Sequence, residues 1–218
     1  MCGRLLDRVA ESTRVYPCML VSPVHHAIRK RASSETRTGS TQWCDCSRWC
    51  GKMNAATKYV EASENVSPLH EYVSDHGQGV SQSELEHATV AGRSVTLSND
   101  VNSDDQDLIA DGIRVTDPAE KSCFNNSLGM WEFNERFSYV EGFAVMTDSD
   151  VGGIEHAWCL LDGEHLVDTT TAAFDHYYGV AIDDPEILRR YAEESPHEGI
   201  LGNHKNRYAF LRDRGYID

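Results

Sequence analysis

Apolar and polar residues alternate most clearly in the second half of the chain. Residues 138–146 are rich in β-branched and aromatic side chains, which predicts a strand. Residues 154–160 and 164–170 predict two more strands, joined at Asp162-Gly163, a sequence typical of a tight hairpin turn. Residues 123–131 predict a helix that precedes these strands. The pattern therefore predicts an α+β fold in which one helix packs on an antiparallel sheet.

The pattern before residue 116 is weaker. Residues 54–76 carry helical spacing that is broken near Ser67-Pro68. Residues 80–105 are polar, and only the alternating run at 93–97 predicts a strand there. A short helix is expected over 104–110, ended by Gly112.

Two further helices are expected after the strands. Pro185 follows two aspartates and suits the first turn of a helix, where carboxylates also favour the helix dipole. Residues 206–214 predict a last short helix, with Gly215 in the position that ends it.

Charge divides the chain near residue 52. Residues 1–52 hold 9 Lys and Arg against 4 Asp and Glu, whereas residues 53–218 hold 11 against 31. The first part also lacks a sustained period. We therefore interpret 1–52 as a disordered extension, or as an artefact of start assignment with Met53 as the true start, and 53–218 as a single domain.

The acidic composition bears on partners and compartment. Dense carboxylates with few lysines favour a surface that stays hydrated in high salt, as in a halophilic host or its virus; an ordinary acidic bacterial protein is the alternative. Nucleic acid is not expected as the main partner, since phosphate binding needs clustered Lys and Arg. No apolar run is long enough to span a bilayer, and 16–24 is too short for a signal sequence, so we expect a cytoplasmic protein, or one in the host cytoplasm or virion, without membrane contact.

Seven cysteines, five of them before residue 51, do not form the even framework of a secreted disulfide scaffold. A metal site built on Cys44, Cys46 and Cys50, with Cys18, His25 or His26, is an alternative. Its spacing differs from the paired C-x2-C of zinc ribbons. We therefore expect neither a metal nor a cofactor.

Cys123, His156 and Asp168 are the candidate catalytic residues. A thiol attacks an amide carbonyl as the thiolate, and Cys123 is expected at a helix N-terminus, where the dipole lowers a thiol pKa. A nearby imidazole, His156, can stabilise the thiolate and later protonate the leaving amine. Asp168 can hold that imidazole in the right tautomer.

The hairpin loop decides whether His156 and Asp168 meet. With a two-residue loop at Asp162-Gly163, His156 would face Thr169 and Asp168 would point to the other side of the sheet. With a three-residue loop over 161–163, His156 would lie directly opposite Asp168. The catalytic interpretation therefore requires an odd loop or an equivalent bulge.

These residues carry a resemblance to a known superfamily. Glu155-His-Ala-Trp158, followed by Leu166-Val-Asp-Thr-Thr170, resembles the HAW and D-x-T signature of the transglutaminase-like superfamily, which shares the papain-like fold. The order of motifs over residues 117–182 also resembles that of small proteins encoded by phages and microbes. The chain departs from the pattern in its compactness, because His156 follows Cys123 closely and Asp168 follows His156 more closely still. It also lacks a clear oxyanion-hole side chain upstream, where Gln106 stands far from Cys123 along the chain.

The resemblance implies that Cys123 is a nucleophile, His156 a base and Asp168 its orienting partner. The implied activity is that of a peptidase, amidase, deamidase or transglutaminase-like enzyme acting on an amide in a peptide or protein. Tyr139, Glu141 and Trp158 are candidates for contact with substrate, and Cys159 is expected to be buried on the opposite face from His156. The alternative is a catalytically silent papain-like fold that acts as a viral or host-interaction binding module. The oligomeric state stays open.

Overall fold

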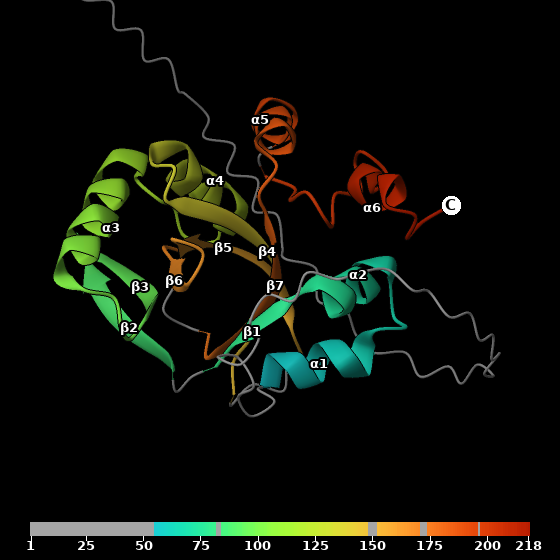
Figure 1. The fold of residues 1–218 in the computed structure, drawn as a ribbon, viewed down its shortest axis with the longest axis horizontal. Coiled ribbons are helices and arrows are strands. Elements are labelled where there is room, and N and C mark those ends of the chain that lie inside the picture. The colour runs from blue at the N-terminus through green and yellow to red at the C-terminus, as the bar shows by residue number, and fades with distance from the viewer. Residues whose placement is uncertain (1–54, 82–83, 148–151, 171–173, 196) are drawn as a thin grey trace, which may run out of the picture.

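The computed structural model describes residues 55–81, 84–147, 152–170, 174–195 and 197–218 (Figure 1). The expectations for residues 1–52, including the metal-site alternative, lie outside the described residues. The helices are α1 (Ala55–Ser63), α2 (Pro68–His76), α3 (Ser103–Thr116), α4 (Cys123–Phe133), α5 (Pro185–Glu194) and α6 (Ala209–Asp213). The strands are β1 (Gln78–Val80), β2 (Leu85–Val90), β3 (Arg93–Ser98), β4 (Phe137–Val145), β5 (Ile154–Leu161), β6 (His165–Asp168) and β7 (His176–Ile182).

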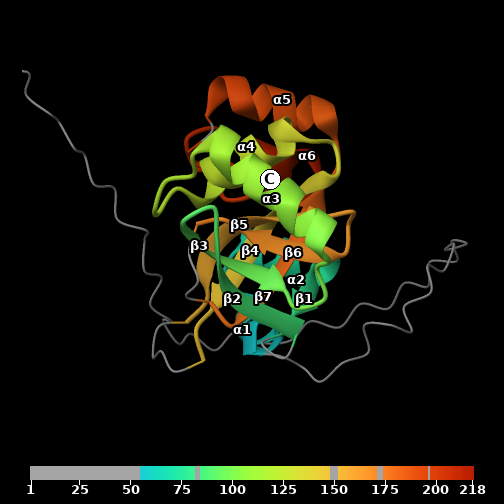
Figure 2. The same ribbon diagram turned by 90° about the vertical axis from the view of Figure 1, so that its left-hand side faces the viewer.

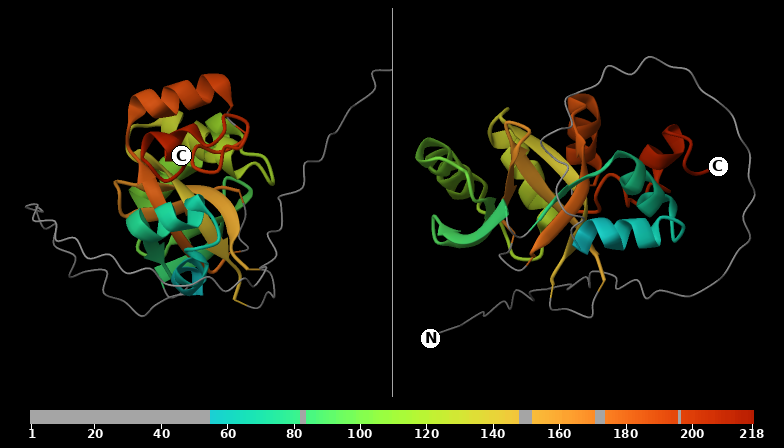
Figure 3. Two further views of the ribbon diagram at one scale, coloured as in Figure 1. Left: turned by 90° about the vertical axis from the view of Figure 1, so that its right-hand side faces the viewer. Right: turned by 60° about the horizontal axis from the view of Figure 1, so that its bottom comes forward.

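The strands form one antiparallel sheet in the order β1-β7-β4-β5-β6-β3-β2. Figure 1 shows the sheet curling between two groups of helices, with α3 beside β2 and β3 at one end and α1 and α2 beside β1 and β7 at the other. Figure 2 shows α3, α4 and α5 above the strands, and Figure 3 shows α1 and α2 from two further sides. The expected α+β class is confirmed.

The two faces of the sheet bury different cores. Alternate residues of β4 and β5, such as Tyr139, Phe143 and Ala157, point outward and pack against the helices. The residues between them, such as Val140 and Trp158, point into the concave face, where the curled sheet packs on itself. A side chain on β5 therefore faces either the helices or the inside of the sheet.

Local signals for helix starts and ends agree with the structure. Ser67 caps α2 by accepting a hydrogen bond from the His70 backbone N–H, and Pro68 occupies the first turn. The break expected at Ser67-Pro68 is thus the boundary between α1 and α2. Asp184 caps α5 in the same way, and Gly215, with φ of +79°, follows α6.

Gly112 does not end the helix that contains it, contrary to the sequence-based expectation. Helix α3 continues to Thr116, and Gly112 faces the side chains of Met130 and Phe133 on α4. A Cβ at this position would lie 2.7 Å from the Cε atom of Met130. The glycine therefore serves helix packing.

The region 80–105 contains more strand than its polar sequence predicts. Strand β3 matches the alternating run at 93–97, but β2 also forms and pairs with it through a turn at Ala91-Gly92. Strand β2 lies at the sheet edge and is largely solvent-accessible, so its sequence lacks the apolar alternation of a half-buried strand.

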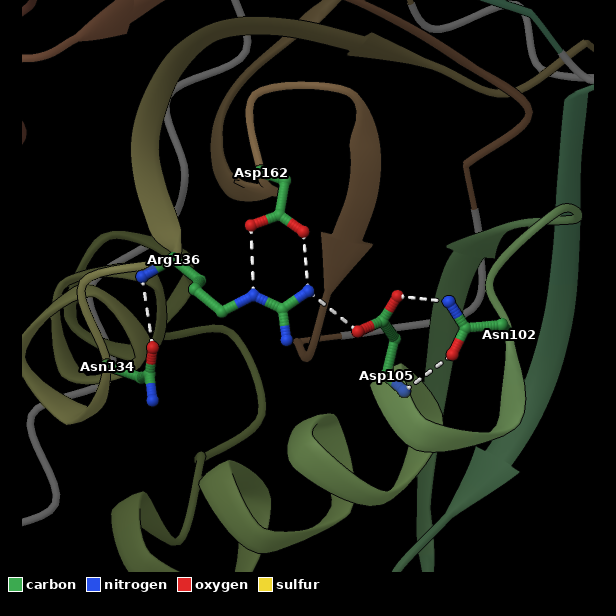
Figure 4. Close-up of polar contacts among 5 residues, drawn as sticks. All are labelled: Asn102, Asp105, Asn134, Arg136 and Asp162. Carbon is green, nitrogen blue, oxygen red and sulfur yellow. Dashed lines mark hydrogen bonds and ion pairs between the residues drawn. The ribbon is translucent and has the colours of Figure 1, made fainter.

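A polar network fixes the hairpin of β5 and β6 to α3 (Figure 4). The Arg136 guanidinium donates from Nε and Nη2 to the two carboxylate oxygens of Asp162, at 2.9 and 2.5 Å, and from Nη2 to Asp105 at 2.8 Å. Asn102 holds the other oxygen of Asp105. This bidentate pairing orients the turn at Asp162-Gly163 relative to the start of β4.

Candidate active site

Cys123 is the first residue of α4 and is 7% exposed. The residue before it, Ser122, makes no capping hydrogen bond with its side chain. Ser122 thus leaves the N–H groups of the first helical turn, beside the thiol, without a cap from its own side chain. The positive end of a helix dipole suits a group that carries negative charge.

His156 links Cys123 to Asp168. Its Nε2 atom donates to Oδ2 of Asp168 at 2.7 Å, and both side chains are buried. Nδ1 is then the ring nitrogen left for the Cys123 thiol, which also interacts with the imidazole. Burial alone would lower the pKa of His156, but the charges of Asp168 and Cys123 and their hydrogen bonds outweigh it and raise the pKa to about 10.

Asp168 is held in place by three donors. Oδ2 accepts the His156 ring and the Tyr177 hydroxyl, the latter at 2.9 Å, and Oδ1 accepts the Thr170 backbone N–H at 2.9 Å. Asp168 has no exposed surface. Its carboxylate is therefore fixed in the orientation that the imidazole requires.

Aromatic rings enclose the imidazole. Phe174 lies 4.8 Å from the ring centre of His156, Tyr177 at 6.1 Å and Trp158 at 6.3 Å. Such walls keep water away from the pair and limit the rotation of the ring. The polar contacts of His156 are thereby strengthened.

The short length of β6 allows α4 to reach His156. The pairing of β5 with β6 covers Cys159–Leu161 and His165–Val167, whereas β5 pairs with β4 as far as Ile154. Asn126 in the first turns of α4 donates to the Thr170 hydroxyl and to the Ala119 carbonyl, and accepts from the Ala119 N–H. These bonds hold the start of α4 beside the residues that follow β6.

The hairpin loop has an odd number of residues, as the site requires, but the register of the two strands differs from the expected one. Leu161 pairs with His165, which leaves a three-residue loop over 162–164. Asp162 and Gly163 both have positive φ, as in a type I′ turn, and the Glu164 N–H donates to the Leu161 carbonyl. His156 and Asp168 thus share a face, while the expectation that they lie directly opposite each other is wrong.

No protein family, curated protein or solved structure matches this chain. Within the described ranges, no three His, Cys, Asp or Glu side chains are grouped so as to hold a metal ion. Across the same part of the chain, every helix is too short or too polar to cross a bilayer.

Glu141 lies beside the site and anchors a later segment of the chain. Its carboxylate accepts the backbone N–H groups of Ile200 at 2.5 Å and Leu201 at 2.8 Å, and the Tyr139 hydroxyl at 2.6 Å. Burial raises its pKa to about 7, against the effect of these donors, and the charge of Glu155 adds to the rise. The segment around Ile200 is therefore fixed over the helix-facing side of β4.

A narrow hollow of about 10 Å³ adjoins His156. It is lined by Leu69, Phe124, Glu141, Gly142, Glu155, His156, Leu201 and Gly202. Glu141 thus lies where a substrate contact was expected. Tyr139 does not, because it is fully buried beneath Glu141, which corrects the expectation of a substrate-contacting residue.

Three other residues named from the sequence do not line the hollow beside His156. Trp158 is 2% exposed, packs over Gly179 and lines a separate, larger hollow of about 390 Å³ at the far end of the curled sheet. Cys159 is buried on the helix-facing side, donates to the Ser127 carbonyl, and burial raises the pKa of its thiol. Gln106, on α3, donates to the Val101 carbonyl just before that helix.

Tyr177 and Asn126 are the contributors to the site that sequence reasoning missed. Tyr177 lies in β7, where two adjacent tyrosines and Gly179 hide the alternation of a strand. Asn126 follows Cys123 by one helical turn, which places it on the same side of α4.

Proposed function

We propose that this chain is a thiol enzyme that acts on an amide bond, with a papain-like or transglutaminase-like arrangement. The observation that carries the proposal is the position of His156, a buried imidazole that contacts Cys123 and donates to Asp168. Helix α4 against an antiparallel sheet is compatible with that arrangement.

The chemistry follows from the order of the three groups. The Cys123 thiolate attacks the carbonyl carbon, and the oxygen takes up negative charge beside the N–H groups of the first turn of α4. His156 gives its proton to the amide nitrogen as the C–N bond breaks, which releases an amine and leaves a thioester. Water or a second amine then attacks the thioester, loses its proton to His156, and restores the thiolate. Asp168 holds the imidazole throughout.

Alkylation of Cys123 by iodoacetamide at pH 6–7, followed by mass spectrometry, tests the proposal. An ordinary thiol, with a pKa of about 8.5, reacts slowly there, whereas a thiolate paired with imidazolium reacts fast. His156→Ala should slow the reaction strongly, and Asp168→Asn should slow it less. His165→Ala on the neighbouring strand is the matched control and should leave the rate unchanged.

Cys159 provides an internal control for folding, because it stays unlabelled as long as the core is closed. A Cys123 that reacts no faster than a free thiol, or a rate indifferent to His156→Ala, would contradict the enzyme proposal. The narrowness of the hollow favours the second candidate in that case, a silent fold that serves as a viral or host-interaction binding module.

A further inference from the structure

The hollow beside His156 combines apolar walls with one carboxylate that forms no ion pair with the described residues. Leu69, Phe124 and Leu201 supply the apolar walls. Of its two carboxylates, that of Glu141 is occupied by two backbone N–H groups and a hydroxyl. The other, Glu155, is the residue directly before His156.

The position of Glu155 follows from strand pairing. It pairs with Phe143 of β4, and because neighbouring side chains alternate, it lies on the helix-facing side while the His156 ring lies on the other. Its Oε2 atom points at Gly202, 2.7 Å from where a Cβ would stand. The residue is exposed overall, but its carboxylate turns toward the hollow, and burial there raises its pKa.

The charges around Glu155 are unbalanced. Among the described residues, no lysine or arginine forms an ion pair with it; the charged groups that affect it are Glu141, a like charge, and the imidazole of His204. Burial raises the pKa of the Tyr59 hydroxyl, and the charge of Glu155 adds to that rise. A positively charged group placed beside the Glu155 carboxylate would therefore gain an attraction that the described residues do not already satisfy.

We infer that Glu155 is a specificity-determining residue that selects substrates with a positively charged aliphatic group near the bond that Cys123 attacks. The hollow has room for about one water molecule, so an aliphatic ammonium group would lie across its open side, with its stem against Phe124 and its charge beside the Glu155 carboxylate. The inference rests on the proposed function, since it concerns the substrate of the same site.

Charged thiol reagents test the inference without a known substrate. The 2-aminoethyl, 2-hydroxyethyl and 2-sulfonatoethyl methanethiosulfonates share one reaction, in which the thiolate attacks the S–S bond, expels methanesulfinate and forms a mixed disulfide. Their rates with Cys123 are measured by mass spectrometry, in the native chain and in Glu155→Gln. The ratio of the cationic to the anionic rate should fall by roughly three- to tenfold in the variant.

Glu164→Gln, the same change at the opposite end of the β5–β6 hairpin, is the control and should keep the native ratio. In the native chain the ratio should also fall as KCl is raised, a readout that does not depend on any variant. Equal ratios in the native chain and Glu155→Gln, or a native ratio insensitive to KCl, would overturn the inference. A slow reaction with the neutral reagent would instead count against the proposed function, so the two failures are distinct.

Discussion

Asp168 accepts the Nε2 hydrogen of His156 across 2.7 Å, although strand pairing does not set the two residues opposite each other. The register of β5 and β6, extended by one residue beyond Val167, places Asp168 opposite Trp158. The contact is therefore diagonal, between residues on the same face of neighbouring strands. It brings the carboxylate to the ring edge and leaves the other ring nitrogen for Cys123.

The raised pKa of His156 predicts a loss of stability in alkali. A protonated imidazole that is held in the fold contributes stability below its unfolded pKa of about 6.5, and the contribution is lost as pH rises through about 10. We expect the melting temperature to fall between pH 7 and 10, and to fall less in His156→Gln. His204→Gln, an exposed histidine, is the control. Identical pH slopes in all three proteins would contradict the prediction.

Tyr177→Phe should remove one of the hydrogen bonds that hold Asp168 in place. The change removes a buried donor to Asp168 and should cost about 1–3 kcal/mol in the free energy of unfolding, measured by denaturant titration. Alkylation of Cys123 should also slow, though less than in His156→Ala, because the carboxylate keeps its other two donors. Tyr178→Phe on the other face of β7 is the matched control. Equal effects of the two changes would show that the hydroxyl of Tyr177 does not position Asp168.

Glu141→Gln should loosen the segment that closes the hollow. An amide can accept a hydrogen bond at its oxygen but not at its nitrogen, so at least one of the Ile200 and Leu201 N–H groups loses its acceptor and should exchange faster with deuterium. The exposed Glu193→Gln serves as the control. If exchange at these two amides is unchanged, Glu141 does not anchor the segment.

Glu141 also predicts a pH dependence. A carboxyl whose pKa rises from 4.5 in the unfolded chain to about 7 in the fold binds its proton more tightly when folded. Stability contributed by the protonated form is thus lost as pH rises from about 4.5 to 7. Thermal melts over this range should show that slope in the native chain and a flatter one in Glu141→Gln. A steeper slope in the variant would contradict the assignment.

Salt should continue to stabilise the protein at concentrations well above those at which ordinary screening is nearly complete. Residues 53–218 carry 31 carboxylates against 11 Lys and Arg, so the fold must overcome strong self-repulsion. We expect the melting temperature to rise with KCl into the molar range, although screening is nearly complete at a few hundred millimolar. A melting temperature that is flat or falling above that range would remove the halophilic interpretation.

The elements nearest the site were the most predictable from sequence. Strands β4 and β5 carry dense β-branched and aromatic residues, and α4 begins at Cys123 as expected. The sequence predicts that His156 and Asp168 share a face of the sheet if the hairpin loop has an odd number of residues. The exact register could not, because Asp162-Gly163 suits a two-residue turn and only the pairing of β5 with β6 adds the third residue.

Elements that depend on distant partners were missed. Strand β7 lies between β1 and β4, yet the glycine at position 179 and its two tyrosines gave no clear prediction. A glycine predicts a helix end, but Gly112 instead makes room for Met130, which belongs to the next helix along the chain. Such positions are set by tertiary packing, which local propensity does not contain.

Gly142 and Gly179 pair across β4 and β7, and a Cβ on either would lie within 2.6 Å of the other strand's backbone. The Trp158 indole covers Gly179 on its remaining side, 2.5 Å from where a Cβ would stand. A larger residue at either glycine is blocked by the strand, and a larger one at 179 also by the indole. Loss of the tryptophan would still leave position 179 blocked by the backbone of β4, so among natural variants the two glycines should persist where the tryptophan does not.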